Sequence, residues 1–354
     1  MLSTVYITSN NGTLSESGDV LEYFDYKGNK TKLLPNKVTQ IIVIGRLTIT
    51  GGAFAILFLH QIDVIFIKKN GKHTSRLIYA EKKNTVLRHK QHIISANQQN
   101  AASIAKDIVR GKLHNQYLFM QRINRKTKHE EHFVKESIKE MGRIRRILES
   151  ANDLNIIRGL EGDASRIYFS CFGMNIYSDW TSFSARSKNP PLDPVNSVLS
   201  FLYTVLANRI GGYIYESGLD SGIGTLHAVS YGRESLIYDL IEEFRTPIVD
   251  TLTCSLFNLR VLNKEDFRVE CIPSGLEDEE ILEQKEDSDV DAVLLTEDGM
   301  KKVLNQFEKK LQTIHKYPLS DKSMTFDKIL KEQVRLYKQV VCGVMDHYLP
   351  MVVV

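Results

Sequence analysis

The chain has 354 residues, of which 42% are hydrophobic and 25% charged, a composition typical of a globular protein with one large domain or two smaller ones. Its formal net charge of +3 is too small to indicate nucleic-acid binding unless the charge is concentrated locally. The four cysteines form no Cys-x-x-Cys pair, which argues against a disulfide framework and a zinc knuckle. Glycines and charged residues interrupt the most apolar window, 41–67, so we expect no membrane span and a cytoplasmic protein.

The first 80 residues contain six short runs rich in β-branched and aromatic residues, separated by turn sequences such as Asn-Gly, and these runs predict strands. The stretch 51–60 predicts a short helix. From residue 82 the pattern becomes helical, with helices expected over 84–95, 101–110, 113–124, 130–150, 248–262, 300–315 and 326–348. We therefore predict an α+β protein with a small N-terminal β-rich domain (1–82) and a larger all-α C-terminal domain (83–354). Exposed strand edges in the first domain would serve dimerisation.

Charge is distributed unevenly along the chain. Between Lys82 and Glu149 there are sixteen Lys and Arg residues against six Asp and Glu. This excess suits contact with a nucleic-acid backbone, although a solvated helix face explains any single residue equally well. Between Glu277 and Asp298 there are eleven acidic residues against one Lys. We predict that this second segment is a mobile surface loop, which lies away from bound DNA or covers a basic groove in its absence.

A polar residue interrupts an apolar helical stripe in the middle of the chain. The stripe runs through 154–172, and Glu161 lies within it. We predict that Glu161 is buried and is protonated, paired with a cation or bound to a metal, because an unpartnered buried carboxylate is costly. An ion pair with Arg158 or Arg166 would give it a purely structural role.

Two further candidates for a polar site lie downstream. His227 ends a glycine-punctuated loop, 218–227, at a junction that can hold a side chain at a cleft. In the helix that follows, Asp239, Glu242 and Glu243 lie opposite the apolar side, which favours a solvated acidic face. However, Asp239 and Glu242 are three residues apart and therefore neighbours, and carboxylates with an imidazole suit Mg²⁺ or Mn²⁺.

A basic loop, Arg186-Ser-Lys-Asn-Pro-Pro-Leu-Asp-Pro, leads into another expected helix. Asp193 suits the N-cap of that helix and Pro194 its first turn. Arg186 and Lys188 are placed where they could hold a phosphate.

Four motifs follow one another in this half of the chain. They are Gly159-Leu-Glu-Gly with Arg166 after it, the basic loop from Arg186 to Asn196, Gly218-Leu-Asp-x-Gly-Ile-Gly-x-Leu-His227, and Arg233-x-Ser-Leu-x-x-Asp239-Leu-Ile-Glu242-Glu-Phe-Arg. In this order and spacing they resemble the CRISPR-associated spacer-acquisition integrase family. The N-terminal Val43-Ile-Gly-Arg-Leu-Thr-Ile-Thr, followed by Gln61-Ile-Asp-Val-Ile-Phe, is similar to that family's β-domain.

The resemblance implies a β-rich domain followed by an all-α catalytic domain. It also implies that Glu161, His227 and Glu242 are the catalytic residues and the ligands of Mg²⁺ or Mn²⁺, with Asp239 as a near neighbour. The implied activity is that of a metal-dependent DNA endonuclease and integrase, which inserts short foreign DNA into a CRISPR array by phosphodiester transesterification.

The expected partners are double-stranded DNA, a second copy of the chain in a homodimer, and the family's small ferredoxin-like subunit. We expect four basic residues to contact the DNA, namely Arg186, Lys188, Arg125 and Lys126. The chain departs from the family's pattern in two places. Asn189 stands where a further basic residue is common, and Thr246 separates Arg245 from Pro247.

Two other functions are compatible with the same residues. One is a stand-alone structure-specific nuclease that acts on branched repair intermediates, and the other is a non-enzymatic nucleic-acid-binding scaffold whose acidic residues are structural. Joining of DNA to an array plasmid, and its need for a divalent ion, would separate these possibilities.

Overall fold

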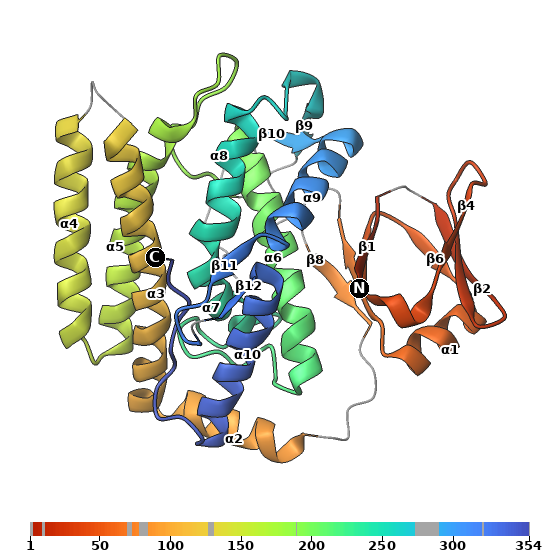
Figure 1. The fold of residues 1–354 in the computed structure, drawn as a ribbon, viewed down its shortest axis with the longest axis horizontal. Helices are drawn as coiled ribbons and strands as arrows, with labels where there is room; N and C mark the ends of the chain where they lie inside the picture. The colour runs from red at the N-terminus through yellow and green to blue at the C-terminus, as the bar shows by residue number, and fades with distance from the viewer. Residues whose placement is uncertain are drawn as a thin grey trace. The chain divides into compact units, whose positions relative to one another are not determined.

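The computed structural model describes residues 3–8, 11–68, 73–77, 84–126, 131–188, 190–272, 290–320 and 322–353. The chain divides into two compact units, Met1–Lys83 and Asn84–Val354. The first unit is rich in strands and the second is mostly helical (Figure 1), which confirms the predicted α+β fold class. Among the helices of the described ranges, none has the length and apolar character needed to cross a membrane.

Two four-stranded sheets form the N-terminal unit. In spatial order, one contains β1 (Ser3–Ile7), β5 (Val38–Ile44), β7 (Asp63–Ile67) and β8 (His73–Arg76), and the other contains β4 (Lys30–Leu33), β3 (Val20–Phe24), β2 (Gly12–Ser17) and β6 (Leu47–Ile49). The helix predicted over 51–60 is confirmed as α1 (Gly51–His60), which begins where the Thr50 side chain accepts the Ala53 N–H. Strands β2 and β4 were not predicted, because their mostly polar sequences show no clear apolar run.

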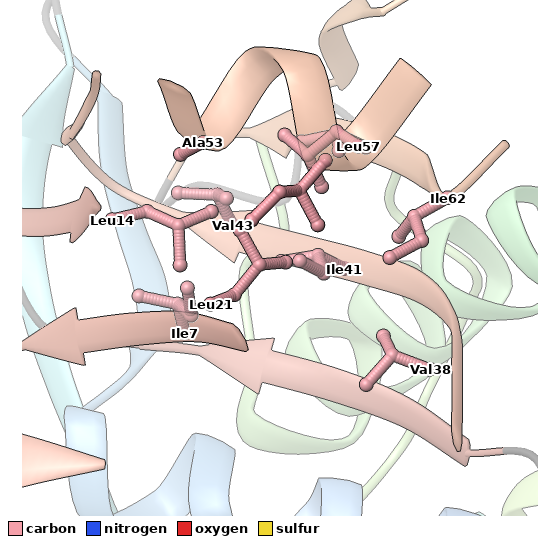
Figure 2. Packing of buried hydrophobic residues seen from close by; sticks show 11 residues of the cluster. Ile7, Leu14, Leu21, Val38, Ile41, Val43, Ala53, Leu57 and Ile62 are labelled. Carbon is pink, nitrogen blue, oxygen red and sulfur yellow. The ribbon is translucent and has the colours of Figure 1, made fainter. Parts of the chain in front are cut away.

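Apolar side chains from both sheets and from α1 share one core (Figure 2). Leu14 and Leu21 come from one sheet, Ile41 and Val43 from the other, and Leu57 from α1, and all five are fully buried. Burial of each such side chain stabilises the fold by about 1.5–3 kcal/mol relative to exposure. The short β-branched runs thus form a unit with its own hydrophobic core.

Helices make up most of the second unit. In chain order they are α2 (Thr85–Ala96), α3 (Gln98–Lys126), α4 (Glu131–Ser150), α5 (Leu154–Phe172), α6 (Pro194–Ser217), α7 (Ser235–Phe244), α8 (Thr251–Asn258), α9 (Glu297–Leu311) and α10 (Phe326–Cys342). Asp193 caps α6 as predicted, because its side chain accepts the Asn196 N–H at 2.8 Å. A π-helical segment, Arg245–Asp250, joins α7 to α8.

Two short sheets, which were not predicted, complete this unit. They pair β9 (Phe267–Ile272) with β10 (Val290–Leu295) and β11 (Ile314–Lys316) with β12 (Ser323–Thr325). The loop predicted for Glu277–Asp298 is therefore wrong from residue 290 onward, where the chain forms β10 and the first turn of α9. The remainder of that segment, 277–289, lies outside the described residues.

The helices predicted over 101–110 and 113–124 are one continuous helix, α3. Gly111, which lies between the two predicted ranges, allows close packing. A Cβ atom at Gly111 would lie 2.5 Å from the Pro350 side chain and 3.5 Å from that of Glu243. The glycine therefore lets residues near 350 approach α3 without ending the helix.

The segment Met345–Val353 packs against α3 and α7. The Asn115 side-chain amide of α3 donates to the backbone carbonyls of Glu243, at 2.7 Å, and Met351, at 3.0 Å. Its carbonyl accepts the Val353 N–H at 2.9 Å. One buried side chain thus ties together two helices and the segment that follows α10.

Candidate active site

Helix α7 carries three acidic residues, Asp239, Glu242 and Glu243, and all three are buried. The solvated acidic face that local periodicity favoured is therefore wrong. Helices α3 and α6 both pack against α7, so its polar side faces protein instead of water. Each carboxylate must find partners there, because an unpartnered buried charge is strongly destabilising.

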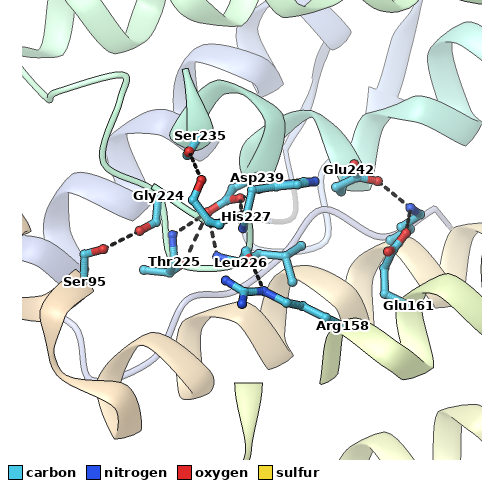
Figure 3. Close-up of polar contacts among 12 residues, drawn as sticks. Ser95, Arg158, Glu161, Gly224, Thr225, Leu226, His227, Ser235, Asp239 and Glu242 are labelled. Carbon is cyan, nitrogen blue, oxygen red and sulfur yellow. Dashed lines mark hydrogen bonds and ion pairs between the residues drawn. The ribbon is translucent and has the colours of Figure 1, made fainter. Parts of the chain in front are cut away.

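Asp239 holds the loop that carries His227 (Figure 3). Its carboxylate accepts the backbone N–H groups of Thr225 and Leu226 at 2.6 and 2.9 Å, and that of His227 at 2.9 Å. The ring atom Nδ1 of His227 lies 2.8 Å from Asp239 Oδ1. A Cβ atom at Gly224 would lie 2.6 Å from Asp239 Oδ2, so only glycine fits there. When Nδ1–H donates to the carboxylate, Nε2 is the ring nitrogen that can bind a metal.

Lys112 of α3 brings Glu161 and Glu242 together. Its side chain is only 7% exposed, and its ammonium forms ion pairs with Glu161 of α5 and, at 2.6 Å, with Glu242 Oε2 of α7. Neither structural pairing considered for Glu161 occurs: Arg158 donates to the Leu226 carbonyl, and Arg166 pairs with Asp163.

A second cation, Arg245, faces Glu242 with its Nε 3.0 Å from Oε1. Burial would raise the pKa of Glu242, but Arg245 and Lys112 lower it to about 2. Burial likewise opposes charge on Lys112, yet Glu242 and Glu161 raise its pKa. Glu242 and Lys112 are therefore both charged at neutral pH.

The cluster borders a cleft of about 240 Å³, which is lined by Arg158, Glu161, Leu226, His227, Ala228 and Arg233. Glu161 is not fully buried as predicted, because 25% of its side chain is exposed. His227, whose side chain is 24% exposed, also borders this cleft. Two of the three predicted ligands thus face the same opening, and the third shares Lys112 with one of them.

The three predicted ligands are close to one another, but they do not form a finished cage. Within the described ranges, no group of three or more His, Cys, Asp and Glu side chains is arranged to hold an ion. The side chains nevertheless suit a divalent ion. Glu161 and Glu242 already share one cation, the Lys112 ammonium. His227, whose ring is held by the Asp239 carboxylate, lies beside them. Oxygen ligands with one imidazole nitrogen suit Mg²⁺ or Mn²⁺.

The predicted DNA contacts differ in their surroundings. The Arg186 guanidinium is hydrogen-bonded to the first turns of α6, where it donates to Asn196 Oδ1 at 2.8 Å and to Ser200 Oγ at 2.9 Å. Lys188 is exposed, and loss of hydration together with the nearby cations Arg245 and Arg186 lowers its pKa. Arg125 is exposed near the end of α3, and the Lys126 side chain lies outside the described residues.

Glu243 has surroundings unlike those of Glu242, its neighbour in sequence. Its carboxylate accepts the Tyr348 hydroxyl at 2.6 Å, the Gln333 amide at 3.1 Å and the Met351 N–H at 2.6 Å. Burial raises the pKa of Glu243 to about 8, although these three hydrogen bonds lower it. Glu243 thus anchors the segment Met345–Val353 and does not reach the cleft.

Sequence reasoning assigned Lys112 to a solvated or phosphate-binding helix face and so missed its role in the site. The signal was available, because Lys112 follows Ile108 and Val109 at helical spacing and therefore lies on the apolar side of α3. The same argument that selected Glu161 would have selected this lysine. Its pairing with two glutamates depends on how three helices meet, which local sequence does not encode.

Carboxylates and an imidazole around a cleft are typical of enzymes that use divalent ions in phosphoryl-transfer chemistry. Residues 5–309 match the family model described as CRISPR associated protein Cas1. A protein of Rhodospirillum rubrum named CRISPR-associated endonuclease Cas1 2 is 30% identical to this chain over 360 aligned positions, covering 99% of this chain and 98% of the relative. The chain therefore belongs to the Cas1 family.

Two solved structures share the fold. One, titled "Casposase bound to integration product", has a TM-score of 0.80 at 20% identity and covers 98% of this chain and 93% of its own. The other belongs to a "Cas6-RT-Cas1–Cas2 complex", with a TM-score of 0.80 at 21% identity over 99% of this chain and 36% of that one. At these identities the likeness concerns the fold alone.

Proposed function

We propose that this protein is a divalent-metal-dependent DNA endonuclease and integrase, which joins short foreign DNA to a CRISPR array by phosphodiester transesterification. The observation that carries the proposal is the meeting of Glu161 and Glu242 on the Lys112 ammonium beside a cleft that His227 lines. Membership of the Cas1 family and a full-length relative named an endonuclease support it. The fold shared with a casposase bound to an integration product adds support for strand joining.

Glu161, His227 and Glu242 would hold the ion, either Mg²⁺ or Mn²⁺. When bound, the ion would polarise the scissile phosphate and stabilise the charge on the attacking or leaving oxygen. Two neighbouring side chains act on these proposed ligands. Asp239 orients the His227 ring through Nδ1, and Arg245 helps to keep Glu242 ionised.

Basic residues around the cleft would take the phosphates of double-stranded DNA. Arg158 and Arg233 line the cleft itself, and the exposed Lys188 is close enough to Arg245 to respond to its charge. Arg125 lies thirteen residues beyond Lys112 on α3, about 20 Å along the helix axis, so it and Lys126 would contact the backbone farther along the duplex. Arg186 would act mainly by shaping the loop that carries Lys188.

The proposal includes two protein partners. A second copy would associate through the N-terminal unit to form a homodimer, and the family's small ferredoxin-like subunit would join it. The neighbour from a Cas6-RT-Cas1–Cas2 complex supports a partner of that kind. The exposed edge strand β4 is a poor dimer contact, because Lys30 and Lys32 lie on it and lysines at strand edges oppose pairing.

A strand-transfer assay tests the proposed function. The purified chain, with and without the small subunit, is incubated with a short 3′-hydroxyl duplex and a plasmid that carries the CRISPR array, in Mn²⁺, Mg²⁺ or EDTA. We expect joined product only with a divalent ion. Glu161→Gln, His227→Ala and Glu242→Gln should each reduce joining by at least about a hundredfold, whereas Glu149→Gln, an exposed glutamate paired with Arg110, should not.

Four results would contradict the proposal. Joined product in EDTA would exclude metal dependence. Full activity in all three variants would show that Glu161, His227 and Glu242 do not form the active site. Cleavage of branched DNA without any joining to the array would favour a stand-alone repair nuclease. DNA binding with no reaction under any condition would favour a scaffold.

A further inference from the structure

The Lys112 ammonium lies where two of the proposed metal ligands converge. It contacts the carboxylates of Glu161 and Glu242, and it reaches them from α3, a third helix. Lys112 and Glu242 have side chains that are 7% and 3% exposed. An ammonium so shielded from water is held by its ion pairs, because hydration cannot replace them.

Charge balance shows that the cluster is complete without a metal. Lys112 and Arg245 supply two positive charges, and Glu161 and Glu242 supply two negative ones. A divalent ion added to these four groups would leave a net charge of +2, of which the Asp239 carboxylate beside His227 could offset only one unit. Such an excess is unfavourable, so an ion can bind well only if one cation gives up its carboxylates.

Of the two cations, Lys112 is the one suited to leave. Arg245 is fixed by other contacts, because its guanidinium also stacks over the Tyr203 ring at 4.5 Å from the centroid. A lysine ammonium sits on a flexible four-carbon stem and carries no planar geometry that fixes its direction. It is also the cation shared by both proposed ligands, and Glu161 opens onto the cleft through which an ion would enter.

We propose that Lys112 is an internal counter-ion, which holds Glu161 and Glu242 together when no metal is bound and competes with the divalent ion for their oxygens. The inference rests on the metal site of the proposed function. Lys112 would then have two opposite effects: it stabilises the metal-free protein, and it weakens the affinity for metal. A lysine with a merely structural role would produce only the first effect.

The test compares Lys112→Met with the wild type and with Lys106→Met, a control at a half-buried lysine on the same helix that contacts Asn152 and neither proposed ligand. Mn²⁺ binding to the full chain is measured by calorimetry at low salt, and melting temperatures are measured in EDTA and in excess Mn²⁺. We expect Lys112→Met to bind Mn²⁺ on the order of tenfold tighter. Its melting temperature should be lower than that of the wild type in EDTA and should rise more on addition of Mn²⁺.

A second variant covers the case in which Lys112→Met fails to fold without metal. Lys112→Gln keeps hydrogen-bond donors while removing the charge, and its Mn²⁺ affinity should also rise. If wild-type protein binds Mn²⁺ and Glu242→Gln loses that binding, but neither Lys112 variant binds more tightly, the counter-ion role is wrong while the metal site stands. If the wild type does not bind Mn²⁺ at all, both the metal site and this inference fail.

Discussion

Glu242 and Glu243 are adjacent on α7 and both buried, yet their pKa values move in opposite directions. Two cations face Glu242 and lower its pKa to about 2, whereas Glu243 meets only neutral donors and burial raises its pKa to about 8. Burial alone therefore does not decide whether a carboxylate is charged. What decides it is whether the neighbouring groups carry charge, as around Glu242, or only dipoles, as around Glu243.

The two groups also affect stability in different pH ranges. The folded-state pKa of Glu242 lies below the ordinary value of 4.5, so its ion pairs stabilise the protein above pH 4.5 and this contribution is lost as the pH falls toward 2. The pKa of Glu243 lies above 4.5, so the unfolded chain loses this proton before the folded chain does. Stability due to Glu243 therefore falls as the pH rises from 4.5 to 8.

The largest effect on stability should come from removing Glu242, the charged carboxylate of this pair. Glu242→Ala leaves Lys112 with one carboxylate and deprives the half-buried Arg245 of the carboxylate it pairs with, and we expect the free energy of unfolding to drop by about 3–5 kcal/mol. Urea denaturation in EDTA at pH 7 measures this loss. Equal stability of the variant and the wild type would mean that Lys112 and Arg245 find other partners. The charged surroundings of Glu242 would then not distinguish it from Glu243.

An intermediate effect should come from neutralising the other carboxylate. In Glu243→Gln the titrating group is gone, so the loss of stability between pH 5.5 and pH 8 should be smaller than in the wild type by on the order of 2–4 kcal/mol. Urea denaturation at the two pH values measures the difference. Parallel pH profiles for the two proteins would show that Glu243 is already ionised when folded.

The smallest effect on stability should come from removing one hydrogen-bond donor to Glu243. Tyr348→Phe removes the hydroxyl that lies 2.6 Å from the carboxylate, which should cost about 1–2 kcal/mol of stability and leave Mn²⁺ affinity unchanged. Calorimetric titration with Mn²⁺, beside a urea melt, checks both parts. A clear change in Mn²⁺ affinity would show that the two neighbouring sites are coupled through α7.

Much of the architecture could be predicted from local sequence, because β-branched runs, helical periodicity and caps act over a few residues. The division into strands and helices, α1, and the Asp193 cap of α6 are examples. Apart from β2 and β4, whose own sequences are mostly polar, prediction failed where contacts between distant parts of the chain matter. The predicted gap at 111–112 does not exist in α3, and the side chain that packs on Gly111 belongs to Pro350, 239 residues away.

The candidate site also has a part that could be predicted from sequence and a part that could not. The resemblance of its motifs to a known family pointed to Glu161, His227 and Glu242, and their roles remain a proposal. The periodicity of α7 could not separate Glu242 from Glu243, since the difference between them lies in which helix each one faces. Lys112 could have been found by the apolar stripe on α3, but its partners could not.

The π-helical segment after α7, Arg245–Asp250, sets the register between the cleft and the core. A π-helical turn holds one more residue than an α-helical turn, and Thr246, which separates Arg245 from Pro247, lies within it. In an ordinary α-helix an extra residue would rotate everything beyond it by about 100°. Glu242, before the segment, faces Lys112, and Asp250, at its end, accepts the Tyr168 hydroxyl at 2.7 Å. The wider turn therefore sets the angle between a carboxylate at the cleft and a carboxylate in the core, and straightening it into an ordinary α-helix would misplace one of the two.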